Sequence, residues 1–287
     1  MERWQAELVL DARAELGEGP LWDSRTGELL WVDIMAGLVH RFEPNSTVDR
    51  VFDVGQPVGA VVLRASGGYA FALRDGFAVG DGDAITVVVP IESGRPDMRM
   101  NDGACDSRGR FWAGTMHLEY EPGAGALFCL DGAGTADTVV TGVTISNGIA
   151  WSPDDTTMYY VDTTTRGIDA FDYDAETGAI AGRRLLMTIE RDAGFPDGLI
   201  VDSEGCIWVA LWDGWGVRRY APDGAHLGTV DVPAARVTKA AFGGPDLGDL
   251  YITTAAADEP DDAQPYAGGL FRARPGAHGL AAHAYAG

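Results

Sequence analysis

The chain of 287 residues has 46% hydrophobic content, enough to bury a large core without disulfide bonds or structural metals. Its 43 acidic and 21 basic residues give a net charge of −22, which disfavours binding to nucleic acid or to an anionic membrane. The N-terminal residues lack the apolar core of a signal peptide, and no apolar run is long enough to span a membrane. Cys105, Cys129 and Cys206 are far apart, so we expect reduced thiols in a cytoplasmic protein.

Short apolar strands with a large aromatic residue recur along the chain. The pattern is clearest in residues 194–210, where two runs rich in Val, Ile and Trp are joined by a polar turn over 202–205. Equivalent aromatic-centred runs recur at intervals of roughly 40 to 50 residues, each after a polar turn, and their central residues are Trp31, Phe71, Trp112, Tyr160, Trp208 and Tyr251. A further strand follows most of them, over 37–42, 125–130, 167–173, 215–220 and 269–272.

Six copies of a four-strand unit predict an all-β fold, a six-bladed β-propeller. Because no stretch has a sustained helical period, an α/β fold is disfavoured. The early strand over 6–10 is expected to complete the last blade and close the ring. No linker interrupts the pattern, which predicts a single domain over 1–287. We expect a loop over 255–269 and, in the tail over 275–287, part of a last strand.

The innermost strand of each blade begins near the central channel, so its first residues face one another across the ring. The positions before the small residue that opens each inner strand are Glu18, Val58, Asp102, Asn147, Asp197 and Lys239. Three are carboxylates, and in a narrow channel their repulsion requires a cation or a proton. Oxygen ligands suit Ca²⁺, Mg²⁺ or Mn²⁺, although carboxylates also bind Zn²⁺.

Each of these positions has a structural alternative. Asp or Asn before Gly is a common turn dipeptide. Lys239 is either a base on the surface or a positive charge that neutralises the ring carboxylates. Trp212 and Trp215 either form an apolar wall for a ligand or pack within a hairpin. The sequence has no nucleophile elbow, no zinc-protease helix motif, no phosphate-binding glycine loop and no EF-hand loop, so no rival catalytic motif competes with the ring.

Several segments, in this order, resemble the SMP-30/gluconolactonase family over nearly the full chain. The resemblance rests on the motifs at 16–22, 99–103, 109–116, 146–152, 171–174, 196–198 and 241–244. It implies a six-bladed propeller with one divalent cation in its channel, held by Glu18, Asn147 and Asp197. It also implies substrate contacts from Arg99, Asn101 and, less directly, Glu119. Lys239 departs from the Ser or Cys that often precedes the last of these motifs, which puts the preferred substrate in doubt.

The resemblance implies hydrolysis of a sugar lactone, an aldono-1,4- or 1,5-lactone, to the sugar acid. The cation would polarise the carbonyl, and Asp197 would take a proton from the attacking water. Arg99 and Asn101 would hold the sugar. Ca²⁺ or Zn²⁺ is expected first, with Mg²⁺, Mn²⁺ or Fe²⁺ as alternatives, and the protein is expected to be a monomer. A phosphotriesterase-like metal hydrolase and a non-catalytic calcium-binding propeller are the competing functions.

Overall fold

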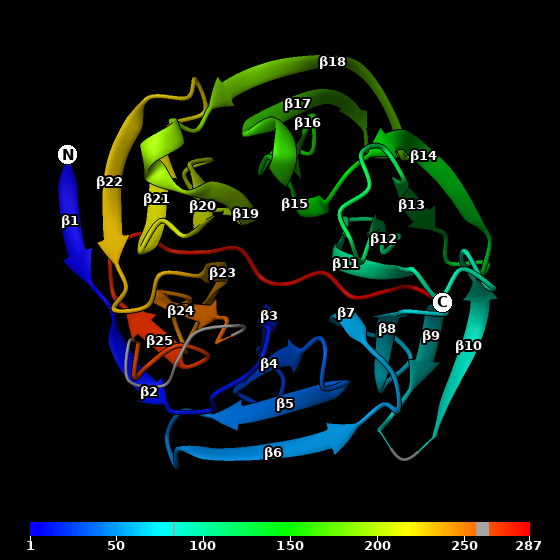
Figure 1. The fold of residues 1–287 in the computed structure, drawn as a ribbon, viewed down its shortest axis with the longest axis horizontal. Helices are drawn as coiled ribbons and strands as arrows, with labels where there is room; N and C mark the ends of the chain where they lie inside the picture. Colours follow the sequence, from blue (N-terminus) through cyan, green and yellow to red (C-terminus); the bar gives the residue numbers. More distant parts are fainter. Residues whose placement is uncertain (83, 257–263) are drawn as a thin grey trace.

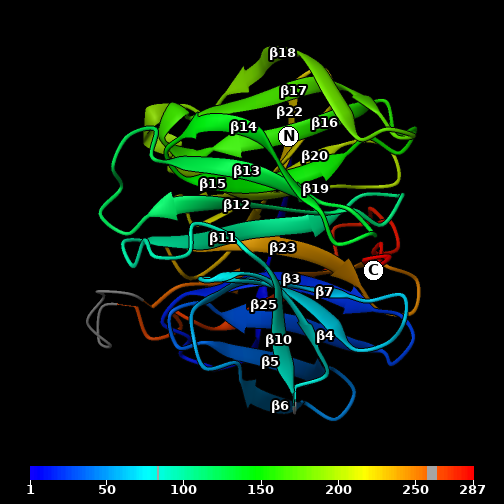
Figure 2. The same ribbon diagram turned by 90° about the vertical axis from the view of Figure 1, so that its right-hand side faces the viewer.

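The computed structural model describes residues 1–82, 84–256 and 264–287, and its strands form six sheets around a central axis (Figure 1). Five sheets have four strands and one has five. Each inner strand contacts the inner strands of the two neighbouring blades, so the ring is closed. The prediction of an all-β, six-bladed β-propeller is confirmed. Seen from the side, the inner strands run along the axis from one face towards the other (Figure 2).

The first three blades are continuous in sequence, and each places its first strand innermost. Blade 1 contains β3 (Gly17–Asp23), β4 (Glu28–Asp33), β5 (Leu38–Glu43) and β6 (Val48–Asp53). Blade 2 contains β7 (Val58–Leu63), β8 (Tyr69–Leu73), β9 (Gly76–Gly80) and β10 (Ile85–Pro90). Blade 3 contains β11 (Met98–Cys105), β12 (Phe111–His117), β13 (Gly125–Leu130) and β14 (Ala136–Val143).

The last three blades include the N-terminal strands and two short 3₁₀ helices nearby. Blade 4 contains β15 (Ser146–Trp151), β16 (Thr157–Asp162), β17 (Gly167–Asp174) and β18 (Ala179–Thr188). Blade 5 contains β19 (Phe195–Val201), β20 (Ile207–Trp212), β21 (Gly216–Tyr220), β22 (His226–Asp231) and β1 (Glu2–Gln5). Blade 6 contains β23 (Val237–Gly243), β24 (Asp249–Thr254), β25 (Leu270–Ala273) and β2 (Glu7–Leu10). The helices are η1 (Thr163–Thr165) and η2 (Arg191–Ala193).

The N-terminal segment joins two blades. As expected, β2 pairs antiparallel with β25 and completes blade 6. The sequence did not indicate β1, which pairs in parallel with the outer strand β22 of blade 5. Arg3 reinforces this pairing, because its Nε donates to Asp231 Oδ2 at 2.6 Å. One short segment therefore covers the outer edge of blade 5 and closes blade 6.

The recurring aromatic residues of the second strands form the core between the blades. Trp31, Trp112 and Trp208 are each at most 1% exposed. In blades 3 and 5 the turn before the second strand explains the repeat. Asp106 accepts a hydrogen bond from Trp112 Nε1 at 2.8 Å, and Asp202 accepts one from Trp208 Nε1 at 2.9 Å. The polar turn and the aromatic residue are thus one packing unit, which is why they recur together.

The expectation of a last strand in the tail is wrong. Residues 275–287 contain no strand, only an isolated bridge from Tyr285 to Arg64, and they cross one face of the ring (red in Figure 1). The tail is held at both ends: Gly279 N–H donates to the Leu247 carbonyl at 2.8 Å, and Tyr285 N–H donates to the Leu63 carbonyl at 2.8 Å. It therefore acts as a strap from blade 6 to blade 2. Its lack of alternating apolar residues fits a strap better than a strand.

The predicted loop over 255–269 and the predicted reduced thiols can be compared with the described residues. Of the loop expected over 255–269, residues 257–263 lie outside the described part of the chain, and the remainder carries no strand. The three cysteines are free, and burial raises the pKa of the Cys129 thiol to about 12. Among the described residues, no helix has the length and apolar character that crossing a membrane requires. A cytoplasmic location stays a prediction.

Candidate functional site

A β-bulge turns the backbone of every inner strand at its ring position. The register between the first and second strands shifts in all six blades. In blade 1 the shift lies between Glu18 and Leu21, and in blade 5 between Pro196 and Leu199. Bulges re-aim side chains next to functional sites. The sixfold repetition explains how residues distant in sequence come to face one axis.

The glycine after the ring position is required by packing. A Cβ at Gly59 would lie 2.2 Å from the Asn101 carbonyl oxygen, and a Cβ at Gly148 would lie 2.5 Å from the Leu199 nitrogen. These contacts join neighbouring inner strands, so the strands approach too closely for any side chain at these two positions. The Asn147-Gly148 pair lies within a strand, so the alternative of a simple turn dipeptide is wrong there.

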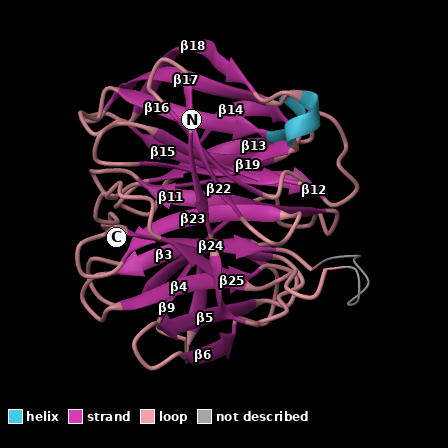
Figure 3. Cartoon of the chain, turned by 90° about the vertical axis from the view of Figure 1, so that its left-hand side faces the viewer, coloured by secondary structure: helices cyan, strands magenta, loops and turns pink. Residues whose placement is uncertain are grey.

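Five of the predicted site residues line one cavity at one end of the channel. This site cavity has a volume of about 620 Å³ and is lined by Glu18, Arg99, Asn101, Asn147 and Asp197, among others. All five are at most 7% exposed. They come from blades 1, 3, 4 and 5. In Figure 3 the short helices lie on one face of the ring and the C-terminus on the other. Thr163 and Thr164 of η1 line the cavity, which places it on the helix face.

Burial and mutual repulsion disfavour the charged forms of the two predicted carboxylate ligands. Burial is the main cause that raises the pKa of Glu18 to about 8, and the charge of Asp102 adds to it. Burial raises the pKa of Asp197 well above its ordinary value, with the charges of Glu18 and Asp102 as further causes. A divalent cation between these groups would offset the repulsion and favour the ionised forms.

Asn147 supplies a third oxygen donor. Its Nδ2 donates to Thr163 Oγ1 at 3.1 Å, which fixes the orientation of the amide. Its Oδ1 is buried and has no hydrogen-bond partner among the described residues. Leaving a buried acceptor unpaired costs about 1–3 kcal/mol. A ligand that binds the lone pair of Asn147 Oδ1, as a cation does, would remove this cost. Two carboxylates and this amide oxygen form a donor set that fits a hard divalent cation.

Arg99 and Asn101 form a linked pair beside these oxygen donors. Arg99 Nη1 donates to Asn101 Oδ1 at 2.6 Å, and Asn101 Nδ2 donates to the Ser146 carbonyl at 2.8 Å. Asn101 therefore ties β11 to β15 next to Asn147. Within the described chain the hydrogen bonds from Arg99 come from Nη1, which leaves Nε and Nη2 for a ligand. Burial lowers the pKa of Arg99 to about 10, so the guanidinium is charged at neutral pH.

Residues 16–256 match the protein family described as the SMP-30/Gluconolactonase/LRE-like region. The chain belongs to this family. The resemblance expected from the sequence motifs is thereby confirmed. The matched range includes the inner strands of all six blades, and with them Glu18, Arg99, Asn101, Asn147 and Asp197.

Relatives of the family match the chain over nearly its whole length. Regucalcin from Xenopus laevis is 36% identical over 299 residues, which covers 100% of both chains. A pentonolactonase from Haloferax volcanii is 39% identical over 275 residues, with 92% of each chain covered. The solved structure of a calcium-binding protein, regucalcin, from Agrobacterium tumefaciens has a TM-score of 0.94 at 30% identity, covering 99% of this chain and 98% of that one.

Lys239 is not a surface base. Its Nζ donates to Asp102 Oδ1, and the two side chains are 6% and 1% exposed. Because β23 and β11 belong to opposite blades, this ion pair spans the channel. Lys239 also lowers the pKa of Glu18 and of Asp197, against the larger effect of burial. The structure thus supports the second alternative, in which Lys239 neutralises part of the ring.

Glu119 is not brought into the site. It is exposed on the turn after β12, and its N–H donates to His117 Nδ1 at 3.1 Å. The next residue, Tyr120, lines the cavity instead. A substrate contact from Glu119 stays a prediction. Of the two tryptophans, Trp212 lines the cavity, whereas Trp215 is 50% exposed and is not among the described lining residues.

A group of lining residues that follow the second strands was not predicted from the sequence. They stand at or just after the ends of β4, β12, β16 and β20, and they include Met35, Leu118, Thr163 and Trp212. The sequence pattern could have located these residues, because each second strand runs back to the face where the inner strands begin. The segment after each aromatic marker was therefore the place to look for them.

Two aspartates hold the segments that lead into the ring positions. Asp33 accepts hydrogen bonds from the N–H groups of Glu15 at 2.9 Å and Leu16 at 3.1 Å. In the opposite blade, Asp162 accepts them from Thr144 at 3.0 Å and Ile145 at 3.1 Å. Each aspartate ends a second strand and fixes the chain two or three residues before a predicted metal ligand.

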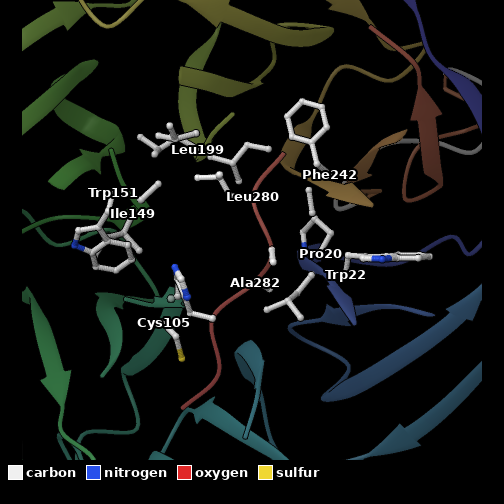
Figure 4. Close-up of a pocket in the computed structure, with 18 of the residues that line it drawn as sticks. Pro20, Trp22, Cys105, Ile149, Trp151, Leu199, Phe242, Leu280 and Ala282 are labelled. Atoms are coloured by element: carbon white, nitrogen blue, oxygen red, sulfur yellow. The ribbon is translucent and has the colours of Figure 1, made fainter. Parts of the chain in front are cut away.

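A second cavity lies on the opposite face of the ring, under the tail. This far cavity has a volume of about 400 Å³, and Lys239 lines its inner end. Apolar side chains from several blades and from the tail surround it, among them Ile149, Leu199, Phe242 and Leu280 (Figure 4). Glu18, Asn147 and Asp197 do not line it, so it lacks the oxygen donors of the site cavity. The Lys239–Asp102 pair lies at the boundary between the two cavities.

One further group of potential metal ligands lies outside the channel. Ligand atoms of Asp202, Glu204 and Cys206 lie within 4.8 Å of one another. Both carboxylate oxygens of Asp202 already accept hydrogen bonds, from Trp208 Nε1, from Arg219 and from the N–H of Cys206. Burial raises the pKa of the Cys206 thiol, which disfavours the thiolate that a metal needs. We therefore interpret these three residues as part of the turn before β20 and not as a metal site.

Proposed function

We propose that this chain is a divalent-metal-dependent hydrolase of sugar lactones, with the cation held by Glu18, Asn147 and Asp197. The observation that carries the proposal is the unpaired Oδ1 of Asn147 beside two buried carboxylates whose pKa values are raised. The relative named pentonolactonase supports the substrate class. The chain would act as one domain over 1–287, as a cytoplasmic monomer that binds neither nucleic acid nor membrane.

When bound at this position, a divalent cation acts as a Lewis acid towards a carbonyl oxygen. Ca²⁺ or Zn²⁺ is the first candidate, and Mg²⁺, Mn²⁺ and Fe²⁺ are compatible with the same oxygen donors. The name of the solved relative, a calcium-binding protein, supports Ca²⁺. With three protein donors, a bound cation would still have room for a lactone and a water.

Asp197 is the general base in this proposal. A carboxylate has two oxygens, so one is available to the cation while the other accepts a proton from the attacking water. Its burial raises its proton affinity, which suits a base that must work near neutral pH. Opening of the ring then leaves the sugar acid and returns the proton to the departing ring oxygen.

Arg99 orients the substrate in this proposal, and Asn101 holds Arg99. The free Nε and Nη2 hydrogens of Arg99 can donate to the ring oxygen or hydroxyls of the lactone. The Oδ1 and Nδ2 of Asn101 are used by Arg99 and Ser146, so its contribution to substrate binding is largely through Arg99. The exposed Glu119 would reach the sugar only after movement of its turn.

The experiment is an acid-release assay on aldono-1,4- and 1,5-lactones, with each cation and with a chelator. We expect turnover that disappears with the chelator and returns with one cation. Asp197→Asn should abolish turnover, whereas Asp172→Asn, an exposed carboxylate on β17, should leave it unchanged. An aryl phosphotriester in the same assay tests the alternative of a phosphotriesterase, and metal binding without any turnover would favour the non-catalytic propeller.

A further inference from the structure

We infer that the site cavity accepts a lactone that carries an apolar substituent, with the carbonyl at the polar floor and the substituent against an apolar rim. The apolar rim consists of Met35, Leu118, Tyr120 and Phe195. The inference rests on the proposed function, because it assigns a substrate class to the same site.

The rim is formed by large apolar side chains that remain in contact with water. Met35 is 40% exposed, Leu118 is 41%, Tyr120 is 60% and Phe195 is 40%, and all four line the site cavity. They belong to blades 1, 3 and 5, which alternate around the ring. Apolar contacts are therefore available from three directions around the mouth of the cavity.

Five other exposed apolar side chains, all on the outermost strands of their blades, have an ordinary explanation. Val48 and Val51 lie on β6, Val87 and Val88 on β10, and Leu185 on β18. The four valines are β-branched residues, which strands favour, and Leu185 is a single exposed leucine on an outer strand. Single exposed apolar residues need no function, whereas a group of them around a cavity marks a binding site.

Polar groups line the cavity at two depths: three charged side chains are buried at its inner end, whereas Glu15 and Thr164 are exposed. Glu18, Arg99 and Asp197 are buried near the axis, while Met116 and Ile145 extend the apolar wall between the axis and the rim. A lactone with its carbonyl at the buried charged groups can direct its hydroxyls to Thr163 or Thr164 and still present a substituent to the apolar rim. An apolar substituent directed at Met35, Leu118 or Phe195 would bury apolar surface that a hydroxyl cannot use.

The wall on the blade 5 side is held in place before any ligand binds. The Arg166 guanidinium lies 4.2 Å from the ring centroid of Phe195, and Arg166 donates to the carbonyls of Glu190 and Arg191 at 3.0 and 3.1 Å. A cation over an aromatic face favours this arrangement. Phe195 thus offers a fixed surface, which lowers the entropic cost of ligand binding.

The size of the cavity supports the same substrate class. A volume of about 620 Å³ lies within the range of sites for drug-sized ligands and exceeds what a single sugar ring requires. A second copy of the chain could also cover exposed apolar side chains. It would then block the mouth of the cavity, so the same residues cannot serve both roles at once.

The test is a series of five-membered lactones that differ only in the alkyl chain next to the ring oxygen, from methyl to pentyl. We expect kcat/KM to rise about two- to fourfold for each added methylene, mainly through KM, because each buries apolar surface at the rim. Phe195→Ser and Leu118→Ser should flatten this dependence. Leu185→Ser, an exposed residue on an outer strand away from the cavity, should leave it unchanged.

The outcomes separate this inference from the proposed function. If aldonolactones are hydrolysed but kcat/KM for the alkyl lactones does not depend on chain length, the inference is overturned and the proposed function stays intact. If no lactone is hydrolysed with any cation, both are overturned. A dimer in light scattering that Phe195→Ser dissociates assigns the rim to a second copy and also overturns the inference.

Discussion

Lys239 and Asp102 form an ion pair across the central channel, between inner strands of opposite blades. Asp102 Oδ1 also accepts a hydrogen bond from the Gly103 N–H at 2.6 Å, while its Oδ2 is buried and has no partner among the described residues. The pair therefore places an additional carboxylate close enough to Glu18 and Asp197 to raise their pKa values, together with the ammonium group that compensates it.

Lys239→Met should destabilise the protein by about 3–5 kcal/mol, because it leaves the Asp102 charge buried without its partner. Lys239→Met combined with Asp102→Asn should recover most of this loss. Urea unfolding in the presence of a chelator measures both values. Equal stability of the single and double variants would contradict the compensation described above.

Without a cation, the stability contributed by Glu18 should fall as the pH rises. Its pKa in the folded protein is about 8, against 4.5 for the ordinary side chain, so the folded state binds more protons between these values. The contribution is complete below pH 4.5 and is lost as the pH passes 8. A bound cation stabilises the ionised form, so the gain in Tm from adding Ca²⁺ or Zn²⁺ should increase over this interval.

Glu18→Gln is the control for this pH dependence. In chelator it should decrease the fall in stability with pH, because the amide does not titrate, and it should also weaken the response to the cation. Thermal unfolding followed by circular dichroism between pH 5 and 8.5 measures both effects. The effect of burial on Glu18 would be contradicted if, without metal, the stability of the wild-type protein rose over this pH interval and that of Glu18→Gln rose in parallel.

Asp162 should act as a positioning residue for Asn147. Asp162→Ala removes the acceptor for the N–H groups of Thr144 and Ile145, which should cost about 1–3 kcal/mol of stability. Because these residues precede Asn147, the affinity for the cation should fall about 10–100-fold. Calorimetric titration with the cation is the readout, with Asp172→Ala in the same blade as control. An unchanged affinity in Asp162→Ala would limit this residue to a role in folding.

Tyr285 should anchor the strap over the far cavity. Its side chain is 2% exposed, and its hydroxyl donates to the Asp131 carbonyl at 2.9 Å. Tyr285→Ala should cost about 3–5 kcal/mol because it empties a buried aromatic site, whereas Tyr285→Phe should cost about 1 kcal/mol through the lost hydrogen bond. Urea unfolding distinguishes the two. A loss below 1 kcal/mol for both variants would mean that the tail contributes little to the ring.

Much of the fold could be predicted because its signals are local. The aromatic residues Trp112 and Trp208 recur with the turns that bond them, so the sequence period matches the structural unit. The ring positions follow from the same period, because Glu18, Asn147 and Asp197 occupy equivalent places in three blades. A closed ring then leaves one axis where they meet.

The rest depends on contacts between segments that have no periodic signal. The parallel pairing of β1 depends on the free edge of β22, far away in the sequence. The strap ends at Tyr285, whose partners belong to blades 2 and 3. Tyr120 enters the site cavity from a turn where its φ is +58°, a conformation that few side chains adopt and that the sequence pattern does not reveal. The same turn carries Glu119 outward.

The most direct test of the central proposal is the anomalous scattering of a crystal grown with Mn²⁺ or Zn²⁺. We expect one strong peak in the site cavity, within coordination distance of Glu18 Oε, Asn147 Oδ1 and Asp197 Oδ. The peak should disappear in the Asn147→Ala variant. A peak beside Asp202 and Glu204 with none on the axis would contradict the proposal.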